Sequence, residues 1–79
     1  MLNKRIERLA ELQRLLRVCP TDVITRCALA LLLEELDLPD EASCHWKRIL
    51  DIDPNNLKAR EGVSRCRKNR AGQPFQSQM

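Results

Sequence analysis

Two prolines that lie 34 residues apart constrain the fold of this 79-residue chain more than any other feature. Pro20 and Pro54 each follow an amphipathic stretch with an apolar residue two positions earlier, Val18 or Ile52, and each precedes a polar pair. Proline disfavours the helical conformation of the residue before it, so each proline marks the end of a helix. The matching contexts predict that the chain contains a repeating helical unit.

The apolar residues between these breaks recur with the period of an α-helix, and no segment alternates in the manner of a β-strand. Short polar side chains after each proline can cap the helix that follows. We therefore expect an all-α fold, an antiparallel helix-turn-helix array within a single domain over residues 1–71. Gly72 ends the last helix, and we expect 72–79 to be a disordered tail. The expected helices span 2–18, 23–36, 39–52 and 57–70.

The charges of the chain are segregated, although 14 Lys and Arg against 11 Asp and Glu give a net charge of only +3. Residues 1–20 carry +3, residues 21–56 carry −5 and residues 57–79 carry +5. This pattern favours neighbouring helices of opposite sign, or stacked copies, over one basic face for nucleic acid. No apolar run approaches the ~20 residues of a membrane span, and no signal-like apolar core follows the start. We expect a small cytoplasmic protein.

The residue types that carry chemistry form no recognisable constellation. Four cysteines (Cys19, Cys27, Cys44 and Cys66) and one histidine include no C-x-x-C pair, and their spacing fits neither a zinc site nor a redox motif. We expect reduced, mostly buried thiols. His45 has no serine or aspartate partner by spacing, and there is no glycine-rich phosphate loop. We therefore expect that the protein is not an enzyme and that it binds no cofactor and no metal.

The segment from Ala28 to Asn56 resembles a tetratricopeptide repeat, a helix-turn-helix unit of 34 residues. The small residues of that family match Ala30 and Ala42, and its large residue in the second helix matches Trp46. Its closing turn matches Ile52-Asp53-Pro54-Asn55. In this register, 2–18 corresponds to the second helix of a preceding repeat and 57–70 to the first helix of a following one.

Two positions depart from the pattern of the family. Arg26 occupies the position of a bulky apolar residue near the start of the first helix, and Asp37 replaces the glycine that closes this helix. These changes affect one packing contact and one turn. One repeat cannot bury its own apolar face, so the flanking helices are expected to cover it.

The resemblance implies that the chain is an adaptor or scaffold that binds a peptide or helix of a partner protein in a concave groove. In the family, this groove is formed by the first helices of the repeats. By register, two stripes would face it, one largely apolar and one largely basic. They consist of Ile24, Cys27, Leu31 and Glu34, and of Lys58, Glu61, Arg65 and Lys68. The carboxylate clamp of the chaperone-binding members is not reproduced.

Three other readings of these residues stay open. The apolar stripe could be covered by the chain's own helices while Arg65 and Lys68 are solvated. Copies of the chain could stack through the exposed half repeats and form a homo-oligomer. Nucleic acid is disfavoured because the basic residues spread around the last helix without a neighbouring aromatic residue. These residues are Lys58, Arg60, Arg65, Arg67, Lys68 and Arg70.

Overall fold

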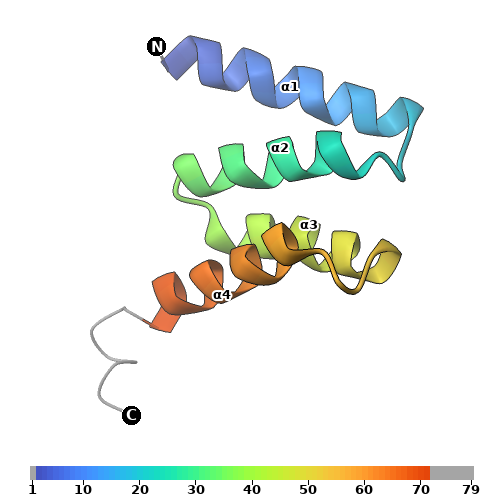
Figure 1. The fold of residues 1–79 in the computed structure, drawn as a ribbon. Helices are drawn as coiled ribbons and strands as arrows, with labels where there is room; N and C mark the ends of the chain where they lie inside the picture. The colour runs from blue at the N-terminus through green and yellow to red at the C-terminus, as the bar shows by residue number, and fades with distance from the viewer. Residues whose placement is uncertain (1, 72–79) are drawn as a thin grey trace.

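The computed structural model describes residues 2–71, which form four α-helices joined by short turns (Figure 1). Successive helices run in alternating directions, and no strand occurs in the described residues. The prediction of an all-α array of antiparallel helices is confirmed. The expected tail, 72–79, lies outside the described residues. The helices are α1 (Leu2–Val18), α2 (Val23–Glu35), α3 (Pro39–Ile52) and α4 (Leu57–Ala71).

Helix α2 is the centre of the array. It packs against α1 on one side and α3 on the other, while α4 packs mainly against α3 and also reaches α2. The backbone of helix α1 does not closely approach that of α3 or α4. The described chain measures 43 × 34 × 15 Å along its principal axes. In so thin an array the central helix cannot be covered on every side.

Side chains in the turns determine where α2 and α4 begin. The Asp22 carboxylate accepts hydrogen bonds from the Thr25 backbone N–H, at 3.4 Å, and from the Thr25 hydroxyl, at 2.7 Å. The Asn56 side-chain oxygen accepts from the Ala59 backbone N–H at 2.9 Å. Such caps satisfy N–H groups that have no partner within the first helical turn. Pro39 begins α3, where its missing N–H is not needed.

The turn between α2 and α3 places Asp37 in the left-handed region, with φ 65°. The Asp37 N–H donates to the Glu34 carbonyl at 3.0 Å, and the Leu38 N–H donates to the Leu33 carbonyl at 2.9 Å. This pair of bonds is the Schellman motif, which usually has glycine in the left-handed position. The aspartate therefore costs backbone energy at the place where the family pattern has glycine.

We expect Asp37→Gly to stabilise the protein by about 1 kcal/mol, because glycine adopts positive φ without a Cβ penalty. Urea unfolding followed by the fluorescence of Trp46 measures the change. Asp53→Gly is the matched control: Asp53 follows α3 with φ −138°, so the same substitution there removes no strain and brings no gain. A loss of stability in Asp37→Gly would contradict this account of the turn.

All four helices contribute side chains to one core around Trp46, which is 1% exposed. Ala30 and Ala42 are fully buried, which lets α2 and α3 approach closely. Gly62 plays the same part on α4, because a Cβ there would lie 2.3 Å from a ring atom of Trp46. The buried apolar residues are Leu12, Leu16, Leu29, Ala30, Leu32, Leu33, Ala42, Trp46, Ile49, Ala59 and Cys66.

The expectation of mostly buried thiols is wrong for two of the four cysteines. All four are free: Cys66 is buried and Cys27 is half-buried, but Cys19 and Cys44 are exposed. Cys19 lies in the turn after α1, and Cys44 lies on the outer side of the amphipathic helix α3, so neither position requires burial. None of the described helices is long and apolar enough to cross a membrane.

Candidate binding groove on the central helix

An apolar stripe on α2 is left uncovered by the other helices. Ile24 and Leu31 are seven residues apart, about two helical turns, so they lie on one face. Ile24 is 82% exposed and Leu31 is 42% exposed. Together with Cys27 and Ala28, they line a hollow of about 380 Å³ that Lys58 borders at the start of α4.

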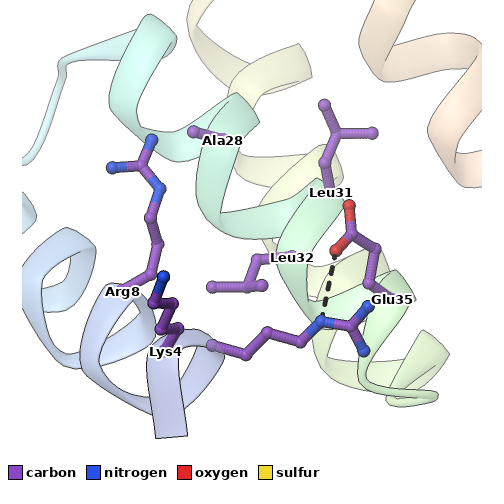
Figure 2. Close-up of a pocket in the computed structure, with 7 residues that line it drawn as sticks. Lys4, Arg8, Ala28, Leu31, Leu32 and Glu35 are labelled. Carbon is purple, nitrogen blue, oxygen red and sulfur yellow. Dashed lines mark ion pairs between the residues drawn. The ribbon is translucent and has the colours of Figure 1, made fainter. Parts of the chain in front are cut away.

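A second hollow, of about 410 Å³, lies between the same side of α2 and helix α1 (Figure 2). Ala28, Leu31 and Leu32 of α2 form its apolar part, and Lys4 and Arg8 of α1 lie across from them. Arg5 and Glu35, which also line this hollow, form an ion pair between Arg5 Nε and Glu35 Oε1 at 3.8 Å, drawn in Figure 2 as the dashed line that ends at Glu35. Both partners are more than half exposed, so this pair contributes little to stability.

The two hollows share Ala28 and Leu31 and therefore form one continuous surface, which we call the α2 groove. Its apolar floor consists of Ile24, Cys27, Ala28, Leu31 and Leu32. Its borders carry cationic residues from two other helices: Lys4, Arg5 and Arg8 on α1, and Lys58 on α4. Glu35 is the one acidic residue that lines either hollow, and it is paired with Arg5.

Glu34 connects three helices inside the array instead of facing the groove. Its side chain is 14% exposed, and its carboxylate accepts a hydrogen bond of 2.7 Å from the Trp46 indole N–H. Arg65 on α4 donates to the same carboxylate from Nε at 3.0 Å and from Nη2 at 3.2 Å. The Arg65 guanidinium also lies 6.0 Å from the centre of the Trp46 ring. This carboxylate satisfies the buried indole N–H and ties α4 to α2.

The hydrogen bond from Arg65 to Glu34, together with the negative charge of that carboxylate, raises the pKa of Arg65 although burial opposes the shift. Burial raises the pKa of the Cys27 thiol, while Lys58 acts in the opposite direction. Burial likewise raises the pKa of Cys66. Both thiols therefore stay protonated at neutral pH and act as small apolar groups, Cys27 in the groove and Cys66 in the core.

The structure brings together four of the eight residues that the sequence predicts for the groove: Ile24, Cys27, Leu31 and Lys58 line one hollow. Glu34 and Arg65 pair with each other and with Trp46. The other two, Glu61 and Lys68, are exposed on α4. The sequence left open that the chain's own helices cover the apolar stripe. In the structure they do not, since Ile24 and Leu31 are both exposed.

Sequence reasoning missed the cationic border on α1. The relevant signal is present, because Lys4 and Arg8 are four residues apart and share one face of the first helix. A single sequence does not tell which polar face of α1 borders α2, however. Among the described residues, no group of three or more His, Cys, Asp or Glu side chains could hold a metal ion.

In comparisons with known proteins, the chain matched no family model, no curated protein and no solved structure. The exposed apolar floor and its cationic borders are therefore the basis for proposing a function.

Proposed function

We propose that this chain is a non-enzymatic interaction module of the tetratricopeptide type, whose α2 groove binds an amphipathic segment of a partner protein. The observation that carries the proposal is the uncovered apolar floor around Leu31, bordered by cationic side chains from two other helices. Such a surface suits a segment with large apolar anchors and flanking carboxylates.

The family assignment is supported by which residues are buried. Ala30 and Ala42, which match the small residues of the family, have no exposed surface, and Trp46 is 1% exposed at the centre of the core. The 34-residue spacing of Pro20 and Pro54 corresponds to two similar turns, one before α2 and one before α4. Helices α1 and α4 cover the central hairpin, as the half repeats of such an array would.

The charges of the groove define the class of ligand. Lys4, Arg8 and Lys58 border the floor without an ion pair among the described residues, whereas Arg5 is paired with Glu35. A ligand with Asp or Glu on both sides of its apolar residues would meet positive charge on both borders of the groove. These exposed charges set the association rate and the orientation of the ligand more than its affinity, which the apolar floor supplies.

Self-assembly is less well supported than partner binding. Apolar residues are exposed on α1, with Ile6 at 51%, Leu15 at 46% and Val18 at 81%. Leu15 and Val18 are neighbours on the helix surface, but Ile6 lies about 180° from Leu15 and about 120° from Val18 around the helix. They do not form the single apolar face that a stable dimer of helices would need.

Nucleic-acid binding through α4 is also less well supported. At ~100° per residue, Lys58 and Arg60 lie on opposite sides of the helix, and Arg67 falls on the same side as Arg60. Arg65 is already hydrogen-bonded to the Glu34 carboxylate. The side chain of Arg70 lies outside the described part of the chain. The basic residues of this helix do not present one surface to a phosphate backbone.

We further propose a cytoplasmic location for the module. All four cysteines are free, and two of them are exposed. A reducing compartment keeps thiols in this form.

We propose no catalytic role, because His45 is hydrogen-bonded to Arg26 and no other histidine occurs in the chain.

Selection from a displayed library of random 16-residue peptides tests the proposal. We expect the peptides recovered on the immobilised chain to combine two or more large apolar residues with flanking Asp or Glu. Backbone amide shifts on titration with the best peptide should change most over α2 and along the edges of α1 and α4 that carry Lys4, Arg8 and Lys58. Recovery of basic peptides, or shift changes away from α2, would contradict the proposal.

A further inference from the structure

Among the side chains that the structure describes, Arg26 is the one buried charged residue, and it forms no ion pair with an acidic residue. It is 7% exposed, and the two ion pairs of the described residues, Arg5–Glu35 and Arg65–Glu34, do not involve it. Its Nη2 donates to the Pro20 carbonyl at 2.8 Å, and its Nη1 lies 3.0 Å from His45 Nδ1. Its Nε is buried without a hydrogen-bond partner. A buried guanidinium is costly unless an anion compensates its charge.

The space beside Arg26 is lined by further cations. A hollow of about 540 Å³ is bordered by Arg17 of α1, Arg26 of α2, and His45 and Arg48 of α3, and none of its lining residues is acidic. A neighbouring hollow of about 480 Å³ shares Arg26, His45 and Arg48, and its other lining residues include both Lys47 and the acidic Asp51. We call the first of these the Arg26 pocket. Three helices thus direct positive charge toward one space.

The protonation states in this pocket follow from its charges. The Arg26 guanidinium only donates, so His45 Nδ1 accepts and the ring proton is on Nε2. Burial lowers the pKa of His45, the positive charges of Arg26 and Arg48 lower it further, and Glu41 acts in the opposite direction. Burial and Arg48 also lower the pKa of Arg26. An anion in the pocket would relieve both effects.

We propose that the Arg26 pocket binds a phosphate dianion, either inorganic phosphate or a phosphate monoester. The guanidinium of Arg26 would hold the anion, and Arg17 and Arg48 would complete its charge compensation. Arginine matches phosphate because its planar fork of N–H donors can pair with two oxygens. Three permanent positive charges without a lining carboxylate favour a dianion over a single carboxylate.

This pocket is separate from the α2 groove. Arg26 lies two residues from both Ile24 and Ala28 and therefore about 160° around α2 from each, which places it on the side of the helix away from the groove floor. The Arg26 pocket and the groove have no lining residue in common. Phosphate binding and partner binding can therefore succeed or fail independently.

The single histidine provides a direct test. The ring signals of His45 are followed by NMR at pH 7.5 during titration with inorganic phosphate, at constant ionic strength maintained with sodium chloride. We expect a saturable shift in the native chain. Acetate, a monoanion, should bind at least ~10-fold more weakly, which corresponds to ~1.4 kcal/mol. Phosphoserine identifies the source of the ligand: tighter binding than phosphate indicates a monoester, and weaker binding indicates free phosphate.

Variants separate a built site from general salt effects. Arg26→Leu introduces the kind of residue that the tetratricopeptide pattern has at this position, and it should abolish the saturable shift while the helix content is retained. Arg17→Gln and Arg48→Gln alter exposed residues and should each weaken phosphate binding about 10-fold. Arg60→Leu, an exposed arginine on α4, is the control and should change nothing. A linear response in the native chain, equal affinity for acetate, or full binding by Arg17→Gln and Arg48→Gln would overturn the proposal.

Discussion

Gly62→Ala is expected to destabilise the protein by about 2 kcal/mol, although alanine is the better helix former. Helix propensity alone would give a gain of about 1 kcal/mol at this position inside α4. The new Cβ, however, would lie 2.3 to 2.5 Å from three atoms of the Trp46 indole. Trp46 is 1% exposed and its N–H is held by Glu34, so the ring has little freedom to move. Overpacking of this kind typically costs about 1–3 kcal/mol and occasionally more.

Urea unfolding followed by circular dichroism measures this loss. Ser64→Ala is the control, because Ser64 is exposed on the same helix and alanine there should leave stability unchanged or slightly higher. In a Trp46→Phe background, the penalty of Gly62→Ala should shrink, because the smaller ring frees space beside α4. A stabilised Gly62→Ala variant would show that α4 does not approach Trp46 as closely as described.

The helices were predictable because residues close in sequence determine where each helix begins and ends. Pro20 and Pro54 end helices through backbone sterics, and Asp22 and Asn56 cap the next ones through side-chain oxygens within three residues. These effects act over a few residues and require no knowledge of the tertiary fold. The same holds for Asp37, whose left-handed conformation is where the family pattern has glycine.

The candidate site was predictable only in part, because register fixes a face of a helix but not the partner of each side chain. Ile24, Cys27 and Leu31 lie where the period of α2 puts them. Glu34 shares that register, yet it turns to the Trp46 N–H, a donor that becomes buried only when α3 packs against α2. The positively charged Arg65 side chain is attracted to the Glu34 carboxylate and donates a hydrogen bond to it. Such pairings depend on distances between helices.

Arg26 illustrates the same limit from the opposite direction. In the sequence, Arg26 occupies the position where the tetratricopeptide pattern has a bulky apolar residue, which predicts a weakened packing contact. In the structure it is buried and bonded to His45, 19 residues away, and to the carbonyl of Pro20. Arg26 thus lies in a cationic pocket whose other basic residues come from α1 and α3. These residues come together only because both helices pack against α2.

Leu31→Glu is expected to lower the affinity of the α2 groove for an amphipathic peptide about 100-fold, which corresponds to ~2.7 kcal/mol. Leu31 lines both hollows of the groove, so a bound segment would cover it from either side. The substitution removes apolar contact area and requires a carboxylate to be desolvated beneath the ligand. The new carboxylate would also compete with those of the ligand for Lys4, Arg8 and Lys58. Folding should be preserved, because Leu31 is 42% exposed.

The most direct test of the binding groove compares Leu31→Glu with Leu38→Glu, using a fluorescently labelled peptide selected on the native chain. Leu38 is 40% exposed and lies in the turn before α3, so the two variants make the same chemical change at similar exposure. Titration by fluorescence anisotropy should show about 100-fold weaker binding for Leu31→Glu. Leu38→Glu should bind the peptide as the native chain does. Native-like affinity in Leu31→Glu, or an equal loss in both variants, would contradict the assignment of the α2 groove as the binding site.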